Sequence, residues 1–269
     1  MNNRIAILGC GWLGLPLAES LQKKGYRIHG STTSKEKLGI LQNKGIDPFL
    51  MSLSEKGIHG DLVGFLSGVD ILVINIPPKL RGSEQEDYVL KMEFLHKALQ
   101  DTGISKVIFV SSTSVYGDLQ GEVTEATPPR PASKSGSQLL AAEGLFQNVK
   151  SLKTTIVRFG GLIGNDRHPI RHLTGKKGLE NGQDYVNLIH LNDCIRLLEH
   201  IIMNNWWGEI FNAVYPHHPI KAEYYRSEAL KRKLPSPEYE PGMGAKGKKI
   251  LSPALSNVKM FRYETSIVT

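Results

Sequence analysis

The stretch Ile5-Ala6-Ile7-Leu8-Gly9-Cys10-Gly11-Trp12-Leu13-Gly14 decides the fold. Its first four residues are apolar, as in a buried strand, and they lead directly into the spacing G-x-G-x-x-G. Residues 13–24 then repeat apolar side chains at helical spacing. A strand that turns into a helix through three glycines predicts the first βα unit of a parallel sheet.

Each glycine of this turn has its own physical task. Gly9 allows the tight turn, Gly11 lacks the Cβ that would keep a pyrophosphate from the backbone, and Gly14 lets helix and strand pack closely. The exposed N–H groups and the positive end of the helix dipole then face the phosphates. The turn therefore predicts a nicotinamide dinucleotide bound at these glycines and at Trp12 and Leu13. A glycine-rich turn without a ligand is the alternative.

The end of the second predicted strand bears on which dinucleotide is preferred. NAD-binding proteins commonly place an acidic residue there to bind the ribose 2′-hydroxyl, but residues 30–35 contain no acid and the first one after the strand is Glu36. Hydroxyl groups and an ammonium group suit a 2′-phosphate, so Ser31, Thr32 and Lys35 favour NADP over NAD. Ser34 can also serve as the N-cap of the next helix.

Short apolar runs alternate with longer amphipathic ones over the first 160 residues, which indicates βαβ units. The predicted strands are 4–9, 26–30, 47–51, 71–76, 106–111 and 154–159, and the predicted helices are 13–24, 35–44, 84–102 and 135–146. Six strands in this order predict an α/β fold with a doubly wound parallel sheet of the Rossmann type.

The regularity loosens after residue 160. A helix at 192–204, a strand at 210–214 and a helix at 222–233 are followed by a tail punctuated by proline and glycine. We expect residues 1–160 to form the dinucleotide-binding core, to which part of 187–214 returns. Residues 161–269 are expected to form a small substrate-binding lobe and cap, not an independent domain.

The composition indicates an ordinary globular protein of 269 residues, with 40% hydrophobic and 22% charged residues. Cys10 and Cys194 are too few and too far apart for a disulfide framework. The short apolar run before Cys10 is too little for a signal peptide, and no apolar run reaches about 18 residues, so we expect a cytoplasmic protein without a membrane span. The net charge of +7 is dispersed, which favours small anions such as nucleotides over nucleic acid.

Five short motifs resemble one known family by their order and spacing. They are VSSTSVYG at 110–117, EATPPRP at 125–131, RFGGLIG at 158–164, IHLND at 189–193 and EIFNA at 209–213. Together with the glycine turn they resemble the extended short-chain dehydrogenase/reductases, the nucleotide-sugar epimerases and dehydratases, nearly as far as Lys233. The resemblance implies an oxidoreductase or epimerase that acts on a small carbonyl, hydroxyl or nucleotide-linked substrate. Subunits of that family often pair through helices on one face, so it also allows a homodimer.

The resemblance breaks at the residues that move protons. In the family a serine or threonine binds the substrate oxygen, and a Tyr-x-x-x-Lys pair on the next helix exchanges the proton, with the lysine lowering the tyrosine pKa. Alignment on the motifs retains the serine as Ser112 but gives Ser135 and Leu139 in place of the pair. The chain therefore resembles an atypical subgroup that lacks the Tyr-x-x-x-Lys pair.

Other side chains could supply the acid or base. We predict a catalytic set of Ser112, Tyr116, Lys134 and Ser135. The alternatives are a structural hydroxyl at Ser112, a packing role for Tyr116 and a solvated Lys134. Two functions stay open: an enzyme with a non-standard acid/base set, and a non-catalytic NAD(P)(H)-binding sensor or regulatory protein.

The resemblance implies further cofactor contacts at the carboxyl ends of the strands. These are Leu53 at the adenine, Asn75, Ile76 and Pro77 beside the ribose and pyrophosphate, and Phe159 and Gly160 beside the nicotinamide. Ser111 is predicted as a further cofactor contact. The double proline that begins at Pro77 can equally be a simple strand ending.

On the substrate side, Arg167 and Arg171 fall in the loop that in the family meets the nucleotide diphosphate. Arginine suits phosphate because its planar fork makes bidentate hydrogen bonds, although a solvated loop arginine is the commoner case. The spacing His-x-x-x-His of His168 and His172 is interrupted by Pro169, so we expect no metal site.

Overall fold

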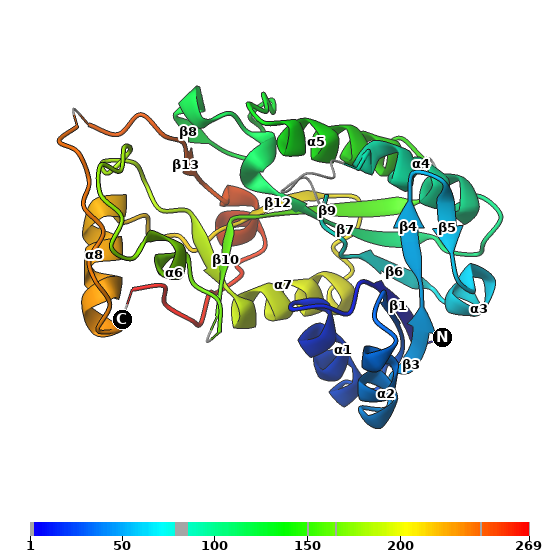
Figure 1. Cartoon of the computed structure of the whole chain (residues 1–269). Helices are drawn as coiled ribbons and strands as arrows, with labels where there is room; N and C mark the ends of the chain where they lie inside the picture. Colours follow the sequence, from blue (N-terminus) through cyan, green and yellow to red (C-terminus); the bar gives the residue numbers. More distant parts are fainter. Residues whose placement is uncertain (1–2, 79–85, 150, 165, 243, 269) are drawn as a thin grey trace. The chain divides into compact units, whose positions relative to one another are not determined.

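A seven-stranded parallel sheet with the order β12-β9-β7-β6-β1-β2-β3 forms the centre of the fold (Figure 1). In this computed structural model, residues 3–78, 86–149, 151–164, 166–242 and 244–268 are described. The strands are β1 (Arg4–Leu8), β2 (Arg27–Thr32), β3 (Asp47–Leu50), β6 (Ile71–Ile74), β7 (Lys106–Ser112), β9 (Lys153–Phe159) and β12 (Ile210–Ala213). The order is that of a doubly wound sheet with its crossover at β1 and β6.

The helices cover the sheet as the alternating pattern predicts. Helices α4 (Tyr88–Leu99) and α5 (Lys134–Gln147) lie side by side on one face, and α1 (Gly14–Lys23), α2 (Glu36–Asn43) and α7 (Leu191–Met203) lie on the other (Figure 1). Because both faces are covered, β1 and β6 are buried almost throughout, which explains their nearly continuous apolar sequence.

The six strands and the helices predicted for the first 160 residues are confirmed to within a few residues, and so are the later helices and strand β12. Residues 84–85 of the predicted helix 84–102 lie outside the described residues. The described helix α4 begins at Tyr88, where the Asp87 carboxylate accepts a hydrogen bond of 3.1 Å from the Leu90 N–H.

One expectation next to the sheet is wrong, and two short features nearby were not predicted. Ser34 is not an N-cap: Lys35 occupies that position without a side-chain cap, and the Ser34 hydroxyl instead hydrogen-bonds the Glu36 carboxylate. The chain also forms an antiparallel hairpin of β4 (Ser52–Ser54) and β5 (Gly57–His59), and the short helix α3 (Leu62–Leu66), which the sequence pattern does not predict. Three-residue strands are too short to show a period.

The chain divides into two compact units. The first takes in Met1–Ser112, Lys134–Val157 and Ile195–Ile210, and the second takes in Thr113–Ser133, Arg158–Cys194 and Phe211–Thr269. The boundary predicted at residue 160, and the role of 161–269 as a substrate lobe, stay predictions.

The second unit has its own small elements and core. Strand β8 (Glu122–Val123) pairs with β13 (Lys249–Ile250), and β10 (Gly161–Ile163) pairs with β11 (Leu188–His190). It also contains the 3₁₀ turns Thr113–Val115 and Asp118–Gln120, helices α6 (Ile170–Leu173) and α8 (Lys221–Lys231), and a π-helix at Ala254–Val258. Its apolar core gathers Ile163, Ile170, Val186, Leu188, Tyr224, Tyr225, Ala229 and Ile267. No helix in the described ranges is long and apolar enough to cross a membrane.

Candidate functional site

The glycine turn is tied to both strands that flank β1. The Gly9 N–H donates a 2.9 Å hydrogen bond to the Ser31 hydroxyl, and the Cys10 N–H donates to the Ser31 carbonyl at 2.8 Å. On the other side the Asn75 amide donates to the Gly9 carbonyl at 2.9 Å. Burial raises the pKa of the Cys10 thiol to about 12, so this cysteine is neutral in the turn. These contacts fix the path of the backbone as it leaves the sheet.

The three glycines of the turn differ in what surrounds them. A Cβ on Gly9, whose φ is +105°, would lie 2.5 Å from the Asn75 carbonyl oxygen, and one on Gly14 would lie 2.1 Å from the Gly9 carbonyl oxygen. A Cβ on Gly11 would meet no protein atom within 4 Å. The fold itself therefore excludes a side chain at Gly9 and Gly14, whereas Gly11 leaves open the space that a pyrophosphate needs to reach the backbone.

The amides of the turn complete this fit. Among the described residues, neither the Gly11 N–H nor the Leu13 N–H has a hydrogen-bond partner, and helix α1 begins directly afterwards at Gly14. Open amides at the positive end of a helix attract phosphate oxygens. The residues present thus fit a dinucleotide pyrophosphate.

The residues predicted to discriminate between NAD and NADP differ in burial and in hydrogen bonding. Ser31 is 3% exposed and its hydroxyl is engaged by Gly9, while buried Thr32 accepts a 3.2 Å hydrogen bond from the Ser34 N–H through its own hydroxyl. Lys35 is exposed at the start of α2. Their contacts to a cofactor stay predictions, and Ser31 has a structural task in addition.

The other predicted cofactor residues of the first unit lie in different local surroundings. Asn75 contacts Gly9 directly, and the Ile76 carbonyl accepts a 2.9 Å hydrogen bond from the Tyr88 hydroxyl. Leu53 lies half-buried in β4, and Pro77 is exposed after β6. Their roles stay predictions.

Phe159 and Gly160 belong to the second unit. Phe159 is buried, and the Gly160 N–H donates a 3.0 Å hydrogen bond to the Ala213 carbonyl. A Cβ on Gly160 would lie 2.7 Å from the Asn187 carbonyl oxygen, so this glycine is required by local packing. Proximity of either residue to a nicotinamide stays a prediction.

The carboxyl end of β7 holds a buried polar pair, of which only Ser111 was predicted from the sequence. The Ser111 hydroxyl donates a 2.6 Å hydrogen bond to Oε1 of Glu143, which lies on α5 and is 1% exposed. Ser112 follows on the strand and is half-buried. A glutamate in an amphipathic helix is normally expected on the solvent-exposed face. The burial of Glu143 depends on its hydrogen bond to Ser111 of β7, which the sequence alone does not reveal.

Helix α5 carries the positions that the resemblance assigned to the missing pair. Lys134 is its exposed first residue, Ser135 is half-buried, and Leu139 is buried. Their catalytic roles stay predictions.

Tyr116, in the second unit, is 1% exposed and lies within a hydrogen-bonded network. Its hydroxyl accepts a 2.7 Å hydrogen bond from Arg158 and faces the Thr124 carbonyl at 3.0 Å and Asn212 Oδ1 at 3.1 Å, either of which can take its proton. Burial raises the pKa of Tyr116, and the Arg158 guanidinium opposes this rise. The geometry favours the packing role, and proton donation by Tyr116 stays a prediction.

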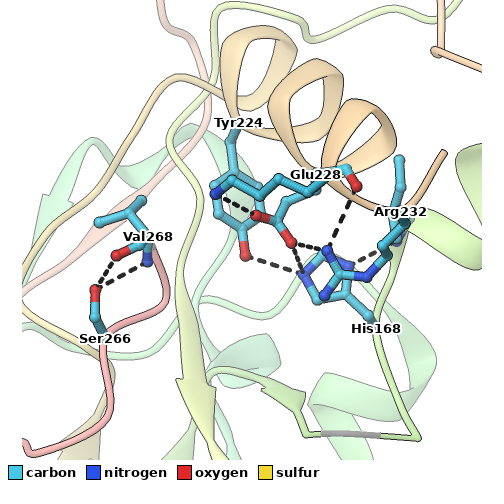
Figure 2. Close-up of polar contacts among 8 residues, drawn as sticks. His168, Tyr224, Glu228, Arg232, Ser266 and Val268 are labelled. Atoms are coloured by element: carbon cyan, nitrogen blue, oxygen red, sulfur yellow. Dashed lines mark hydrogen bonds and ion pairs between the residues drawn. The ribbon is translucent and has the colours of Figure 1, made fainter. Parts of the chain in front are cut away.

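The predicted phosphate-binding arginines lie at α6: Arg167 precedes the helix and Arg171 lies within it. Arg167 and Arg171 are exposed, as is His172, whereas His168 is buried against α8 (Figure 2). The histidines of the His-x-x-x-His spacing thus differ in their surroundings. Within the described ranges, no group of three or more His, Cys, Asp or Glu residues could hold a metal ion.

The sequence matches a family model described as NAD(P)H-binding over residues 9–187. Protein YeeZ of Escherichia coli is 34% identical over 263 residues, which are 97% of this chain and 96% of YeeZ. The range matched by the family model includes the glycine turn and the catalytic candidates Ser112, Tyr116, Lys134 and Ser135.

Solved structures share the fold over nearly the whole chain. The UDP-glucuronic acid 4-epimerase of Bacillus cereus in complex with NAD superimposes with a TM-score of 0.78 at 20% identity, covering 98% of this chain and 94% of that one. The dTDP-glucose 4,6-dehydratase of Bacillus anthracis in complex with NAD gives a TM-score of 0.78 at 17% identity, covering 98% and 92%. The chain therefore belongs to the NAD(P)H-binding family, and its Rossmann-like fold is that of the extended short-chain dehydrogenase/reductase type found in nucleotide-sugar epimerases and dehydratases.

Proposed function

We propose that the protein is an NAD(P)-dependent oxidoreductase of the epimerase/dehydratase type, with NADP preferred and a small carbonyl, hydroxyl or nucleotide-linked substrate. The observation that carries this proposal is a shared sheet edge. Strands β1, β6 and β7 run parallel and in register, so the glycine turn after Leu8 and the polar end of β7 at Ser112 emerge at the same edge. Open α/β sheets bind their ligands at this carboxyl edge.

The chain's own residues divide the work in the proposed reaction. When bound, the nicotinamide exchanges a hydride with a substrate carbon. The Ser112 hydroxyl orients the substrate oxygen, and the buried Ser111–Glu143 pair holds the strand end from which Ser112 projects. No tyrosine in the sequence is followed four residues later by a lysine, so the proton passes through another group, for which Lys134 and Ser135 on α5 are the candidates in the first unit.

The preference for NADP follows from charge at the end of β2. The Ser34 hydroxyl engages the Glu36 carboxylate and lowers its pKa, and Lys35 is exposed beside them. An ammonium group attracts a 2′-phosphate more than it attracts a 2′-hydroxyl. With the Ser31 hydroxyl engaged in the turn, we assign the discrimination to Lys35.

A nucleotide-linked substrate is supported from the second unit. Arg167, just before α6, and Arg171, within it, are both exposed and are four residues apart in the sequence. Guanidinium groups bind diphosphate oxygens in pairs. The solved structures with this fold include enzymes whose names specify UDP- and dTDP-linked sugars.

Turnover assays test the proposal. The purified chain is incubated with NADP or NADPH and a panel of nucleotide sugars and simple carbonyl compounds, beside the variants Ser112→Ala and Ser137→Ala. Ser137 is exposed on α5 and serves as the matched control. We expect turnover that Ser112→Ala abolishes without loss of cofactor binding and that Ser137→Ala leaves intact. Equal activity in all three proteins contradicts the role of Ser112.

A second function is favoured by helix α5. Ser135 and buried Leu139 stand where the resemblance places the proton-transferring pair. A chain that binds the dinucleotide and transfers no hydride would act as a sensor or regulatory protein. Tight NADPH binding with no turnover on the whole panel supports this second function over the first.

A further inference from the structure

A buried polar cluster includes His168, which lies in the segment 167–171 between Arg167 and Arg171. His168 Nε2 is 3.0 Å from the Tyr224 hydroxyl and 3.5 Å from Oε2 of Glu228 (Figure 2). The His168 and Glu228 side chains are 4% and 5% exposed. Tyr224 and Glu228 are one turn apart on α8, so this helix presents both groups to the same ring.

The hydrogen bonds fix the protonation of the His168 ring. The Ile170 N–H donates to Nδ1 at 3.2 Å, so Nδ1 must carry a lone pair. The ring proton is then on Nε2, where the Tyr224 hydroxyl and the Glu228 carboxylate can accept it. Burial lowers the pKa of His168 to about 4, which keeps this neutral form near pH 7. Both ring nitrogens are thus engaged, and the ring has a defined orientation.

Glu228 is held as a carboxylate by two cations at the C-terminal end of α8. Lys231 Nζ is 3.0 Å from Oε1, and Arg232 donates to Oε2. Burial opposes ionisation, but these hydrogen bonds and charges lower the pKa of Glu228 overall. A buried carboxylate that is paired in this way provides a fixed acceptor for His168.

The segment 167–171 depends on the contacts of His168 because it forms little regular structure of its own. Helix α6 has only four residues, and its first described amide contact is the one to His168 Nδ1. The Arg171 N–H donates to the His168 carbonyl at 3.2 Å, and the Arg167 backbone exchanges two hydrogen bonds with Gly164. The backbone of Arg171 is therefore bonded directly to His168, whereas Arg167 precedes His168 in the chain and its backbone is held by Gly164.

We propose that His168, held by Tyr224 and Glu228, is a positioning residue that presents Arg167 and Arg171 to the two phosphates of a nucleoside diphosphate group. The inference rests on the proposed nucleotide-linked substrate and names how the site for it is built. A loop that is fixed before the ligand arrives loses less conformational entropy on binding, so the anchor contributes to affinity without touching the ligand.

Calorimetry with UDP and UMP on the full chain saturated with NADP tests this inference. His168→Asn keeps an acceptor for the Ile170 N–H but cannot reach Tyr224, and His168→Gln keeps a donor towards Tyr224 but loses the acceptor. Tyr224→Phe removes a single hydroxyl. Arg171→Ala removes a direct contact, and His172→Asn alters an exposed histidine of the same helix as the matched control.

We expect UDP to bind roughly tenfold more weakly to both His168 variants, and UMP to be affected less, so that the ratio of UDP to UMP affinity falls. Arg171→Ala should change this ratio in the same direction, and His172→Asn should leave it unchanged. A merely structural role would weaken both nucleotides equally, and this outcome would overturn the inference.

Two other outcomes separate the inference from the proposal beneath it. If Arg171→Ala weakens UDP binding and the folded His168 variants bind UDP like the wild type, the positioning role fails while the nucleotide-linked substrate stands. If the wild type binds neither nucleotide, the nucleotide-linked substrate fails and the inference fails with it. Should the His168 variants not fold, Tyr224→Phe gives the decisive ratio, and an unchanged ratio there contradicts the inference.

Discussion

The hydroxyl of Ser111 donates a hydrogen bond of 2.6 Å to the carboxylate of Glu143, and both residues are buried. The pair joins the carboxyl end of β7 to helix α5, which covers it. Its neighbour Ser112 is only half-buried. We therefore expect the two adjacent serines to have separable tasks: Ser111 in stability and, as proposed above, Ser112 at the candidate site.

Replacing Ser111 should cost stability. Ser111→Ala deprives a buried carboxylate of a hydrogen-bond donor, which we expect to lower the free energy of unfolding by about 1–3 kcal/mol. Ser112→Ala should lower it by less than about 1 kcal/mol. Urea unfolding of the two variants measures the difference, and equal losses would contradict the division of tasks.

The glycines of the chain should respond differently to the same substitution. Gly14→Ala forces a Cβ to within 2.1 Å of the Gly9 carbonyl oxygen, so we expect it to destabilise the fold by several kcal/mol. Gly144→Ala, where a Cβ meets nothing within 4 Å inside helix α5, should stabilise the protein by about 0.4–1 kcal/mol. Thermal unfolding compares them, and similar melting temperatures for the two variants would refute the close approach at Gly14.

The strands and helices of the sheet could be predicted because each is long enough to show a period. The alternation of apolar runs with amphipathic stretches gave β1, α1 and their successors to within a few residues. Hairpin β4–β5 escaped because three residues show no period, and Glu143 escaped because its burial depends on a partner 32 residues away in the sequence. The tail after residue 234 forms little regular structure, as its prolines and glycines predicted.

The candidate site was predictable only where spacing alone imposes geometry. The spacing G-x-G-x-x-G predicted the turn, but the hydrogen bond from the Gly9 N–H to the Ser31 hydroxyl depends on how β1 and β2 pair. Burial of His168 likewise depends on α8, which lies about 50 residues further along the chain. Neither contact can be predicted from the local sequence, because both form only when distant segments pack together.

Lys35 should affect the choice of cofactor. We expect Lys35→Ala to weaken NADPH binding roughly fivefold, about 1 kcal/mol, and to leave NADH binding within twofold, because only NADPH carries the 2′-phosphate. Lys37→Ala removes the charge of another exposed lysine, in the first turn of α2, and serves as the control. Fluorescence titrations give both affinities. Parallel losses for NADPH and NADH would count against the assignment of Lys35.

His168 should make stability fall in mild acid. The burial of its ring, with Arg232 adding to the effect, lowers the pKa in the folded protein from 6.5 to about 4. As the pH falls below 6.5, the unfolded chain takes up a proton that the folded chain does not, so the free energy of unfolding falls by up to about 1.4 kcal/mol per pH unit. Above pH 6.5 the contribution is constant.

Urea unfolding between pH 7 and pH 5 measures this dependence. His168→Asn should show a shallower decline than the wild type, and His172→Asn should retain the wild-type slope. If His168→Asn and the wild type decline in parallel, a different group is responsible for the acid sensitivity.

Tyr116 should prove to be a stabilising residue. Tyr116→Phe removes the oxygen that accepts the 2.7 Å hydrogen bond from buried Arg158, and we expect a loss of about 1–3 kcal/mol in the free energy of unfolding. Turnover per folded molecule should persist if the packing role is the whole of its function. A variant of wild-type stability that has lost all turnover would instead identify Tyr116 as the proton donor.

The most direct test of the account is a titration of the wild type and of Gly11→Ala with NADPH. A methyl group at Gly11 meets no protein atom within 4 Å, so the variant should melt like the wild type without ligand. With NADPH at about 100 times its dissociation constant, the wild type should gain about 2.7 kcal/mol of stability and melt at a higher temperature, whereas the variant should gain little because the methyl group occupies the path of the pyrophosphate. A wild type whose melting temperature and fluorescence do not respond to NADPH or NADH would contradict the account.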